Sequence, residues 1–583
     1  MDQRISEYDI RKQKVQTLRD LSVLPYAQQF DKHYSINDII NDTHPQRSIE
    51  EILEWPRSTI STAGRLMLKR VSGKLTFWQI MDETGTIQIM REHQNSRLIA
   101  SSWTERSEVE GSHTTDKMLG QAHHKLSHAE LVSASKDFGR FWSTSEWHGP
   151  EWQNYASKRN EFLWESTKSF DYLFVDKLLD VGDFVGIRGE LFVTHKGERT
   201  LFVSEYQLLS KAIRPLGDKF HGIGDANIEK MYRQRYLDMI FNKESLDRMK
   251  LRSTFIKTLR EFYRKEWFIE LDTPILGNSA SGAAANPFIT HHNDFDTDMY
   301  LRIAPEIALK IATVGWLEKV FEIGKDFRNE GSSPSHHQEF LVIEHYAAYR
   351  NYIHNIEFTE KLFNYLFDTI PELKRTIQVA DKEWIVREVT FWQTRERIDY
   401  IERIKQDSGI DVSLYGPEDE STLRELIKSQ WFDRKGLDIQ TTATMIDYLY
   451  KKVTRPKIIW PAFIYNYPKT MQPLARTNDE NPMIVEQFQA IVNGWEILKA
   501  YSELIDPIEL QANFDAQGEA LARGDDDATK SDDEFVTAME YGMPPQSWRG
   551  MGIDRILAML TEQSNIRDVI MFPMMKPENS LIE

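Results

Sequence analysis

The pattern of apolar residues changes near residue 215, and this change constrains the fold more than any other feature of the chain. Before it, apolar and polar residues alternate in short runs between turn residues, which predicts β-strands at 63–70, 75–82, 86–90, 183–194 and 199–209. After it, a long stretch with helical spacing precedes mixed helix and strand patterns. Because 583 residues exceed one core, we predict a small β domain and a large α+β domain.

The boundaries of the expected domains follow from the same patterns. We expect a helical extension at 1–50, a five-stranded β-barrel at 51–214 and the large domain at 215–583. Helical spacing within the extension predicts one helix over about the first 30 residues. Five short strands in one small domain are typical of the oligonucleotide-binding (OB) barrel.

The segment 92–160 interrupts the predicted barrel between its third and fourth strands. It has no sustained period of 2 or 3.6, which favours a poorly ordered insertion. A metal site is the alternative, and its candidate ligands would be His113, His123, His124 and His128. Their spacing is irregular, so we favour the insertion.

Composition excludes several classes of protein. The chain has no cysteine, so disulfides, thiolate catalysis and cysteine-ligated metals are excluded. The first residues lack the apolar region of a secretory signal, and no apolar run approaches the roughly 20 residues that span a bilayer. We therefore expect a cytoplasmic protein without a membrane segment. A net charge of −18 argues against a general nucleic-acid coat but leaves room for a local basic face.

Two predicted strands of the large domain carry side chains suited to a nucleotide. Arg328 ends the first strand, and its guanidinium fork suits a phosphate or a carboxylate. Phe340 begins the returning strand and offers a flat face on which a base can stack. Taken alone, each residue would be better explained by a surface ion pair or by core packing.

A second group of candidates lies near the C-terminus. In GMGIDR (550–555), the glycines let the backbone pass close to a ligand, and Arg555 lies in the first helical turn, where the helix dipole does not stabilise a cation. A ligand therefore explains Arg555 better than stability does. Upstream, Glu496 could face phosphates through a metal, and Glu503 could face a cationic substrate.

Long runs around these residues resemble class II aminoacyl-tRNA synthetases, most closely the bacterial-type lysyl-tRNA synthetase family. The runs are GAAANPFITHHNDFDTDMYLRIAPE (282–306), VFEIGKDFRNEG (320–331), PLARTNDENP (473–482), GMGIDR (550–555) and NIRDVIMFP (565–573). The resemblance covers nearly the whole chain apart from the insertion. It implies an OB-fold anticodon-binding domain and a catalytic domain with an antiparallel sheet flanked by helices.

The resemblance also implies roles for individual residues. ATP contacts are implied for Arg328, Glu330, His336, Phe340, Glu496 and Arg555, with Arg328 and Arg555 the catalytic pair. Lysine contacts are implied for Gly282, Glu306, Arg328, Glu344, Tyr346, Lys499 and Glu503. Glu496 matches a Mg²⁺ ligand, whereas Gln489 replaces a usual second carboxylate. Carboxylates suit the lysine ammonium, which has three donors to satisfy.

The predicted barrel fits an RNA-binding role. Four cations and no acid lie between residues 60 and 75, namely Arg65, Lys69, Arg70 and Lys74. Phe77, Trp78 and Gln88 are expected on the surface of the next two strands, where such barrels stack bases and bond their edges. By resemblance, Phe77 and Gln88 match anticodon-reading positions, and we add Arg65 to this candidate tRNA site.

The implied reaction is ATP-dependent ligation of L-lysine to tRNA(Lys) through a lysyl-adenylate, by a homodimer. A synthetase for aspartate or asparagine is one alternative, although the acids Glu344 and Glu503 argue for a cationic substrate. A lysine ligase acting on another acceptor is a second, against which the barrel argues. A non-catalytic RNA-binding protein is a third, against which the presence of Arg328, Glu496 and Arg555 argues.

Overall fold

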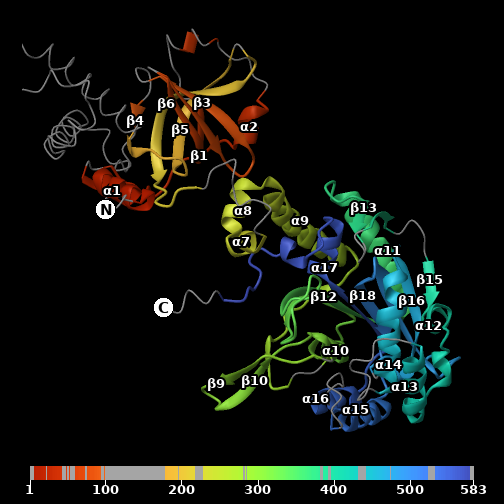
Figure 1. Cartoon of the computed structure of the whole chain (residues 1–583). Coiled ribbons are helices and arrows are strands. Elements are labelled where there is room, and N and C mark those ends of the chain that lie inside the picture. Colours follow the sequence, from red (N-terminus) through yellow and green to blue (C-terminus); the bar gives the residue numbers. More distant parts are fainter. Residues whose placement is uncertain are drawn as a thin grey trace, which may run out of the picture. The chain divides into compact units, whose positions relative to one another are not determined.

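The structure is a computed structural model whose parts divide into two units, Met1–Gly222 and Ile223–Glu583, and each unit is described by itself (Figure 1). The described residues are 6–20, 23–42, 48, 51–52, 59–72, 75–92, 97–98, 177–194, 196–216, 228–279, 282–283, 285–380, 385–391, 396–430, 441–472, 474–522 and 532–577. Nearly all of the predicted insertion, including its four histidines, lies outside these residues.

Unit 1 is built on one antiparallel sheet with a closing parallel pair. Its elements are α1 (Glu7–Asp20), α2 (Ile36–Ile40), β1 (Ile60–Ser72), β2 (Leu75–Met81), β3 (Thr86–Glu92), β4 (Arg97–Leu98), β5 (Phe184–Val193) and β6 (Arg199–Ser210). The strands pair in the order β3-β2-β1-β5-β6-β4, and β3 also pairs with β6. The pairings of β3, β2, β1, β5 and β6 therefore form a closed circuit.

The N-terminal helix is shorter than the sequence suggested. It ends at Asp20, and Tyr26 beyond it forms a single bridge with Ser210 at the end of β6. Pro25 explains the break, because proline lacks an amide hydrogen and disfavours helix in the residue before it. Lys14 still ties the helix to the unit through an ion pair of 2.6 Å with Asp180.

Unit 2 contains an eight-stranded sheet and the helices that cover it. Its helices are α7 (Ile228–Arg233), α8 (Arg235–Phe241), α9 (Lys243–Lys265), α10 (Glu306–Val314), α11 (Tyr352–Thr369), α12 (Tyr400–Ser408), α13 (Glu420–Ser429), α14 (Thr442–Leu449), α15 (Pro507–Ala522), α16 (Asp533–Glu540) and α17 (Ile553–Leu560). The sheet strands are β7 (Ile269–Glu270), β11 (Lys319–Phe327), β12 (Glu339–Ala348), β15 (Glu396–Asp399), β16 (Ala462–Pro468), β17 (Ile484–Val492), β18 (Trp495–Ser502) and β19 (Gln546–Gly552).

The strand order of this sheet is β15-β16-β17-β18-β19-β12-β11-β7, and its inner pairs are antiparallel. Smaller pieces complete the unit: β8 (Leu276–Gly277), β9 (Ile289–His292) and β10 (Thr297–Leu301) form one sheet, and β13 (Thr376–Ala380) and β14 (Val386–Thr390) form another. The antiparallel sheet flanked by helices confirms the class II architecture expected of the large domain.

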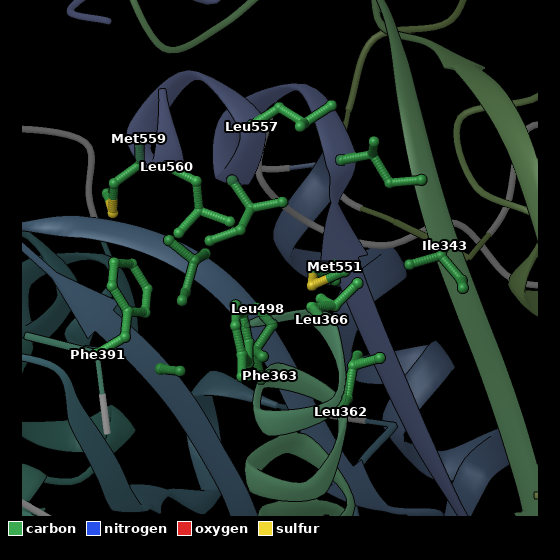
Figure 2. Packing of buried hydrophobic residues seen from close by; sticks show 14 of the residues in the cluster. Ile343, Leu362, Phe363, Leu366, Phe391, Leu498, Met551, Leu557, Met559 and Leu560 are labelled. Carbon is green, nitrogen blue, oxygen red and sulfur yellow. The ribbon is translucent and has the colours of Figure 1, made fainter. Parts of the chain in front are cut away.

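One apolar core lies between the sheet and α9, α11 and α17 (Figure 1). Figure 2 shows Leu557 and Leu560 of α17 pointing toward the same interior as Leu362 and Leu366 of α11. A second core on the other face includes residues of α10, α12, α14 and α16. Because successive side chains of a strand point to opposite faces, the sheet can fill one core and still present polar residues on its other face.

Within the described part of the chain, no helix is both long enough and apolar enough to cross a lipid bilayer.

Candidate active site

A cavity of about 2110 Å³ lies over the face of the large sheet that turns away from α9 and α11. It brings together most of the predicted site residues: Gly282, Glu306, Arg328, Glu330, His336, Phe340, Glu344, Gln489, Glu496, Lys499 and Arg555. The two other candidates, Tyr346 and Glu503, are buried at 0% and 2% exposure and do not line the cavity. They lie behind its wall.

Arg328 and Phe340 meet as the sequence predicted. Arg328 follows β11, and its guanidinium lies over the Phe340 ring at 5.2 Å from the centroid. Its Nε donates to the carbonyl of Ile303 at 3.3 Å. The backbone contact fixes the arginine and leaves its terminal nitrogens for a ligand.

Arg555 is held into the cavity by backbone carbonyls. Its Nη1 donates to the carbonyl of Glu496 at 2.6 Å, and its Nη2 donates to that of Ser335 at 3.4 Å. Burial lowers the pKa of Arg555, and the guanidinium groups of Arg455 and Arg328 lower it further. A cation that burial and like charges both disfavour is suited to receive an anion.

His336 belongs to the same cationic end. Burial, followed by the charges of Arg555 and Arg455, lowers its pKa to about 4, so the ring is neutral at physiological pH. The neighbouring His337 is different, because its Nδ1 is bonded to the carbonyl of Glu339 at 3.0 Å and its Nε2 accepts from the amide of Met574 at 3.0 Å. Only His336 therefore has a ring free of backbone partners.

The opposite end of the cavity is acidic, and a buried lysine that the sequence analysis did not identify lies behind it. Lys310 is one turn after Glu306 in α10, and its Nζ lies 2.6 Å from Glu306 Oε1 and 2.8 Å from Glu503 Oε2. Tyr501 also donates to Glu306 Oε1, at 2.9 Å. The charges of both carboxylates hold the pKa of Lys310 above its ordinary value although burial opposes this.

Glu344 is the acid at this end that lies on the cavity wall. It is on β12, and the indole Nε1 of Trp548 donates to its Oε2 at 2.8 Å. Burial, followed by the charges of Asp326 and Glu306, raises the pKa of Glu344 well above its ordinary value. A carboxylate in this state favours an incoming cation.

Atoms behind Glu344 also lack partners. The hydroxyl of Tyr346 and Oε1 of Glu503 are buried and accept or donate no hydrogen bond within the described residues. Burial, opposed by Lys310 and reinforced by Glu306, raises the pKa of Glu503 to about 8. Buried polar atoms without partners are costly, so this end of the site is suited to an added donor.

A tight backbone approach positions the Glu306 region. Gly282 has φ +89°, and a Cβ there would lie 3.0 Å from the Cβ of Glu306. Glycine is thus required both by its conformation and by its closeness to Glu306. Its location supports the predicted role beside the acidic end.

Arg302 crosses the strand that leads to Arg328. Its Nη1 donates to Glu322 Oε1 at 2.6 Å, and its Nε lies 3.4 Å from Asp326 Oδ1. A Cβ on Gly324 would lie 2.0 Å from Arg302 Nη2, so only glycine leaves room for this crossing. Burial raises the pKa of Asp326 to about 7 although the charges of Arg328 and Arg302 lower it.

The predicted metal position has one suitable carboxylate. The carboxylate of Glu496 faces the cavity and has no hydrogen-bond partner within the described residues, whereas Gln489 Oε1 accepts from the hydroxyl of Tyr467 at 2.7 Å. No group of three His, Asp or Glu side chains that could hold a metal is found among the described residues. These donors fit a Mg²⁺ ion that takes its other ligands from phosphates and water.

Lys499 faces Gln489 across the β17–β18 pair. Its Nζ donates to Gln472 Oε1 at 2.9 Å, and burial lowers its pKa although Glu496 and Glu306 raise it. A buried ammonium here lies between the acidic and the cationic ends of the cavity.

The tRNA candidates of unit 1 are only partly as expected. Phe77 and Gln88 line a small cavity of about 180 Å³ together with Leu68, Arg70, Trp78 and Gln79. Arg65 does not line it, since it pairs with Met81 at the other end of β2 and its guanidinium lies 4.4 Å from the Phe184 ring centroid.

Our expectation for Trp78 was wrong. Its side chain is 1% exposed and packs edge to face on Tyr206, with the centroids 5.4 Å apart. Trp78 adjoins the same small cavity as Phe77, but neighbouring residues of a strand face opposite sides, so its ring points into the core. The aromatic surface of β2 is therefore provided by Phe77.

Comparison with known proteins is consistent with this geometry. The family described as "tRNA synthetases class II (D, K and N)" matches residues 227–576. The chain therefore belongs to the class II tRNA synthetases.

Curated relatives narrow this class. A lysine–tRNA ligase of Aquifex aeolicus is 34% identical over 98% of this chain and 95% of its own length. Those of Thermotoga maritima and Clostridium novyi are 35% and 42% identical, over 97% and 69% of this chain and 95% and 77% of their own lengths. Within the class, the chain belongs to the lysine–tRNA ligases, the enzymes that attach lysine to tRNA.

Proposed function

We propose that the large cavity activates L-lysine with ATP to lysyl-adenylate and then transfers the lysyl group to tRNA(Lys). One observation carries this proposal, namely that a carboxylate-rich end and a guanidinium-rich end face each other in one cavity. The acidic end suits the ammonium of lysine, and the cationic end suits the phosphates of ATP. An anionic amino acid such as aspartate would require a cation where Glu344 lies.

The side chains of this chain supply positioning and charge stabilisation. Glu344, with Tyr346 and Glu503 behind it, receives the lysine side-chain ammonium, and Glu306 with the backbone near Gly282 receives the α-amino group. Arg328 aligns the carboxylate of lysine with the α-phosphate of ATP. Because both substrates are bound side by side, the carboxylate oxygen is already positioned to react with the α-phosphorus. No covalent enzyme intermediate is therefore needed.

Adenine would stack on Phe340, while Glu330 and His336 contact the nucleotide and Arg555 holds the terminal phosphate. Glu496 would hold Mg²⁺, which when bound neutralises charge on the phosphates. Since Gln489 offers only a neutral amide, the chain's own cations are left to stabilise much of the developing charge.

We also propose that unit 1 is an OB-fold that binds the anticodon. The closed circuit of five strands, with β3 and β6 parallel, supports this assignment. Phe77 offers a ring for stacking, and Gln88 an amide for a base edge. Arg65 lies on the same outward side of β1 and would contact the RNA backbone.

A homodimer is the third part of the proposal. Trp267 and Trp316 are 84% and 88% exposed, and they precede β7 and β11, which pair in parallel at the sheet edge. Both have positive φ, 67° and 75°, a conformation that costs energy for a bulky residue. Light scattering should give twice the chain mass of 68.4 kDa, and a monomer at micromolar concentration would contradict the proposal.

The test of the function is ATP–pyrophosphate exchange with each proteinogenic amino acid, followed by aminoacylation of tRNA(Lys). We expect exchange with lysine above all others, and its loss in Arg328→Ala. Exchange driven by aspartate or asparagine would overturn the assignment. Exchange with lysine but no charging of tRNA would instead indicate a different acceptor.

A further inference from the structure

Arg455 is a cation of the active-site cavity to which neither the sequence motifs nor the resemblance gave a role. It follows α14 at the point where the helix widens into a π-helical turn, η6 (Tyr450–Thr454), and it begins the short turn η7 (Arg455–Lys457). Single π-turns occur preferentially at functional sites because they redirect one side chain out of the helical pattern.

The hairpin turn that joins β17 and β18 fixes this segment. The amide of Gly494 donates to the carbonyl of Ile458 at 2.8 Å, and that of Asn493 donates to the carbonyl of Ile459 at 2.7 Å. A Cβ on Gly494, whose φ is +70°, would lie 3.4 Å from the Arg455 carbonyl oxygen. The backbone of Arg455 is thus packed against the turn that precedes Glu496.

The side chain of Arg455 lines the cavity without a counter-ion. It makes no hydrogen bond, and no carboxylate lies within 4.0 Å of it, within the part of the chain that the structure describes. Its charge nevertheless acts on Arg555 and His336, where it lowers the pKa of each. Arg328 acts on the same two groups, so the three guanidinium groups lie at the end of the cavity that contains His336.

A simpler explanation is that Arg455 is an ordinary surface cation. Two nearby lysines show what such a surface cation looks like. Lys451 and Lys457 form ion pairs with Asp447 at 2.6 Å and with Asp407 at 3.0 Å. Arg455 is half-buried, lies among like charges and lacks such a partner. A cation in this setting is destabilising unless an anion joins it.

We propose that Arg455 binds the β- and γ-phosphates of ATP, and hence the pyrophosphate that leaves. This inference rests on the proposed function, since it assumes that ATP occupies the cavity. When the lysine carboxylate oxygen bonds to the α-phosphorus, the bond from that phosphorus to the bridging oxygen breaks and its electron pair leaves with pyrophosphate. Arg455, beside Arg555, stabilises the charge that collects there, at the place where Gln489 offers no carboxylate for a second metal.

The experiment measures binding of inorganic pyrophosphate to the full chain by calorimetry with divalent ions chelated. We expect Arg455→Ala to weaken binding about tenfold or more, the usual value of a charge-assisted contact. Lys452→Ala is the matched control, because Lys452 lies on the same π-turn, outside the cavity and 5.9 Å from the Tyr448 ring. It removes the same charge and should change binding less than about twofold.

A second variant and a kinetic measurement distinguish loss of phosphate binding from misfolding. Arg455→Gln removes the charge but keeps a polar group and the first three side-chain carbons, so it should fold if Arg455→Ala does not. The KM for ATP in the exchange reaction should rise in both variants while the KM for lysine stays constant. Equal pyrophosphate binding by wild type and a folded Arg455 variant would overturn the inference. A wild-type chain that binds neither pyrophosphate nor ATP would instead overturn the proposed function.

Discussion

The two ends of the active-site cavity carry opposite charges. One end has more carboxylates than cations, and the other has more guanidinium groups than carboxylates. At the acidic end, Glu306 and Glu503 share the ammonium of Lys310, while Glu344 has no such ion pair and its pKa is raised by burial. At the cationic end, burial and the guanidinium groups of Arg555, Arg455 and Arg328 lower the pKa of His336. Each substrate therefore supplies the counter-charge that its end of the cavity lacks.

The ends differ in one respect. Lys310 is an internal ammonium that already pairs with Glu306 and Glu503, whereas Arg328, Arg455 and Arg555 form no ion pair within the described residues. The acidic end is therefore partly neutralised before a substrate binds, and the cationic end is not.

Glu344→Gln should abolish most lysine binding while ATP binding is retained. Removing the charge that pairs with a buried ammonium costs about 3 kcal/mol, roughly a hundredfold in Kd. Calorimetry with lysine, and separately with a non-hydrolysable ATP analogue, measures both affinities. Arg555→Ala is the reciprocal variant and should weaken only the nucleotide. If either variant weakens both ligands equally, the two ends are not independent.

Lys310→Met should destabilise the fold, because it leaves two buried carboxylates without their ammonium. The expected cost is about 3 kcal/mol in the free energy of unfolding. Adding Glu503→Gln should restore part of this loss, since it removes one of the uncompensated charges. Urea unfolding of the two single variants and the double variant measures the coupling, and strict additivity would contradict the ion-pair role of Lys310.

The two ligands should respond differently to pH. Since the pKa of Glu344 is raised and that of Glu503 is raised to about 8, lysine binding should release protons and tighten as the pH rises from about 6.5 to about 8.5. The limit is about tenfold per pH unit for each proton released. His336, whose pKa is about 4, stays neutral throughout, so this residue should add no pH dependence to ATP affinity beyond that of the nucleotide itself. A lysine affinity independent of pH would contradict the acidic end as described.

Lys499→Met should give the smallest change in ligand affinity. It should also show whether Lys499 contacts the carboxylate of the substrate or repels its ammonium. If Lys499 contacts the substrate carboxylate, lysine should bind about fivefold more weakly, and lysinamide, which lacks that carboxylate, should bind unchanged. If Lys499 instead opposes the substrate ammonium, both ligands should bind more tightly. Titration of each ligand distinguishes these results, and we expect the first.

Residues in long motifs were predictable, and residues outside them were not. Arg328 and Phe340 were found because a strand, a polar loop and a returning strand must place their ends together. Lys310 was missed because its spacing from Glu306 is that of an ordinary surface pair, and only the packing of α10 turns it inward. Arg455 depends on a π-turn, which leaves no pattern in the sequence.

The misplaced Trp78 has a different cause. Strand alternation was available in the sequence and places Phe77 and Trp78 on opposite faces. Their shared aromatic character suggested a common surface, but burial of the larger ring contributes more to the core of unit 1. Residue type was given more weight than position.

Gly324 does not line the cavity, yet the position of Arg302 depends on its lack of a side chain. Any other side chain there would displace Arg302, which neutralises Glu322 and approaches Asp326, on the strand that ends in Arg328. Choosing variants by distance from a ligand would overlook this position. The tolerance of the active site to mutation is thus set partly by the methyl-sized space that Gly324 leaves for the guanidinium of Arg302.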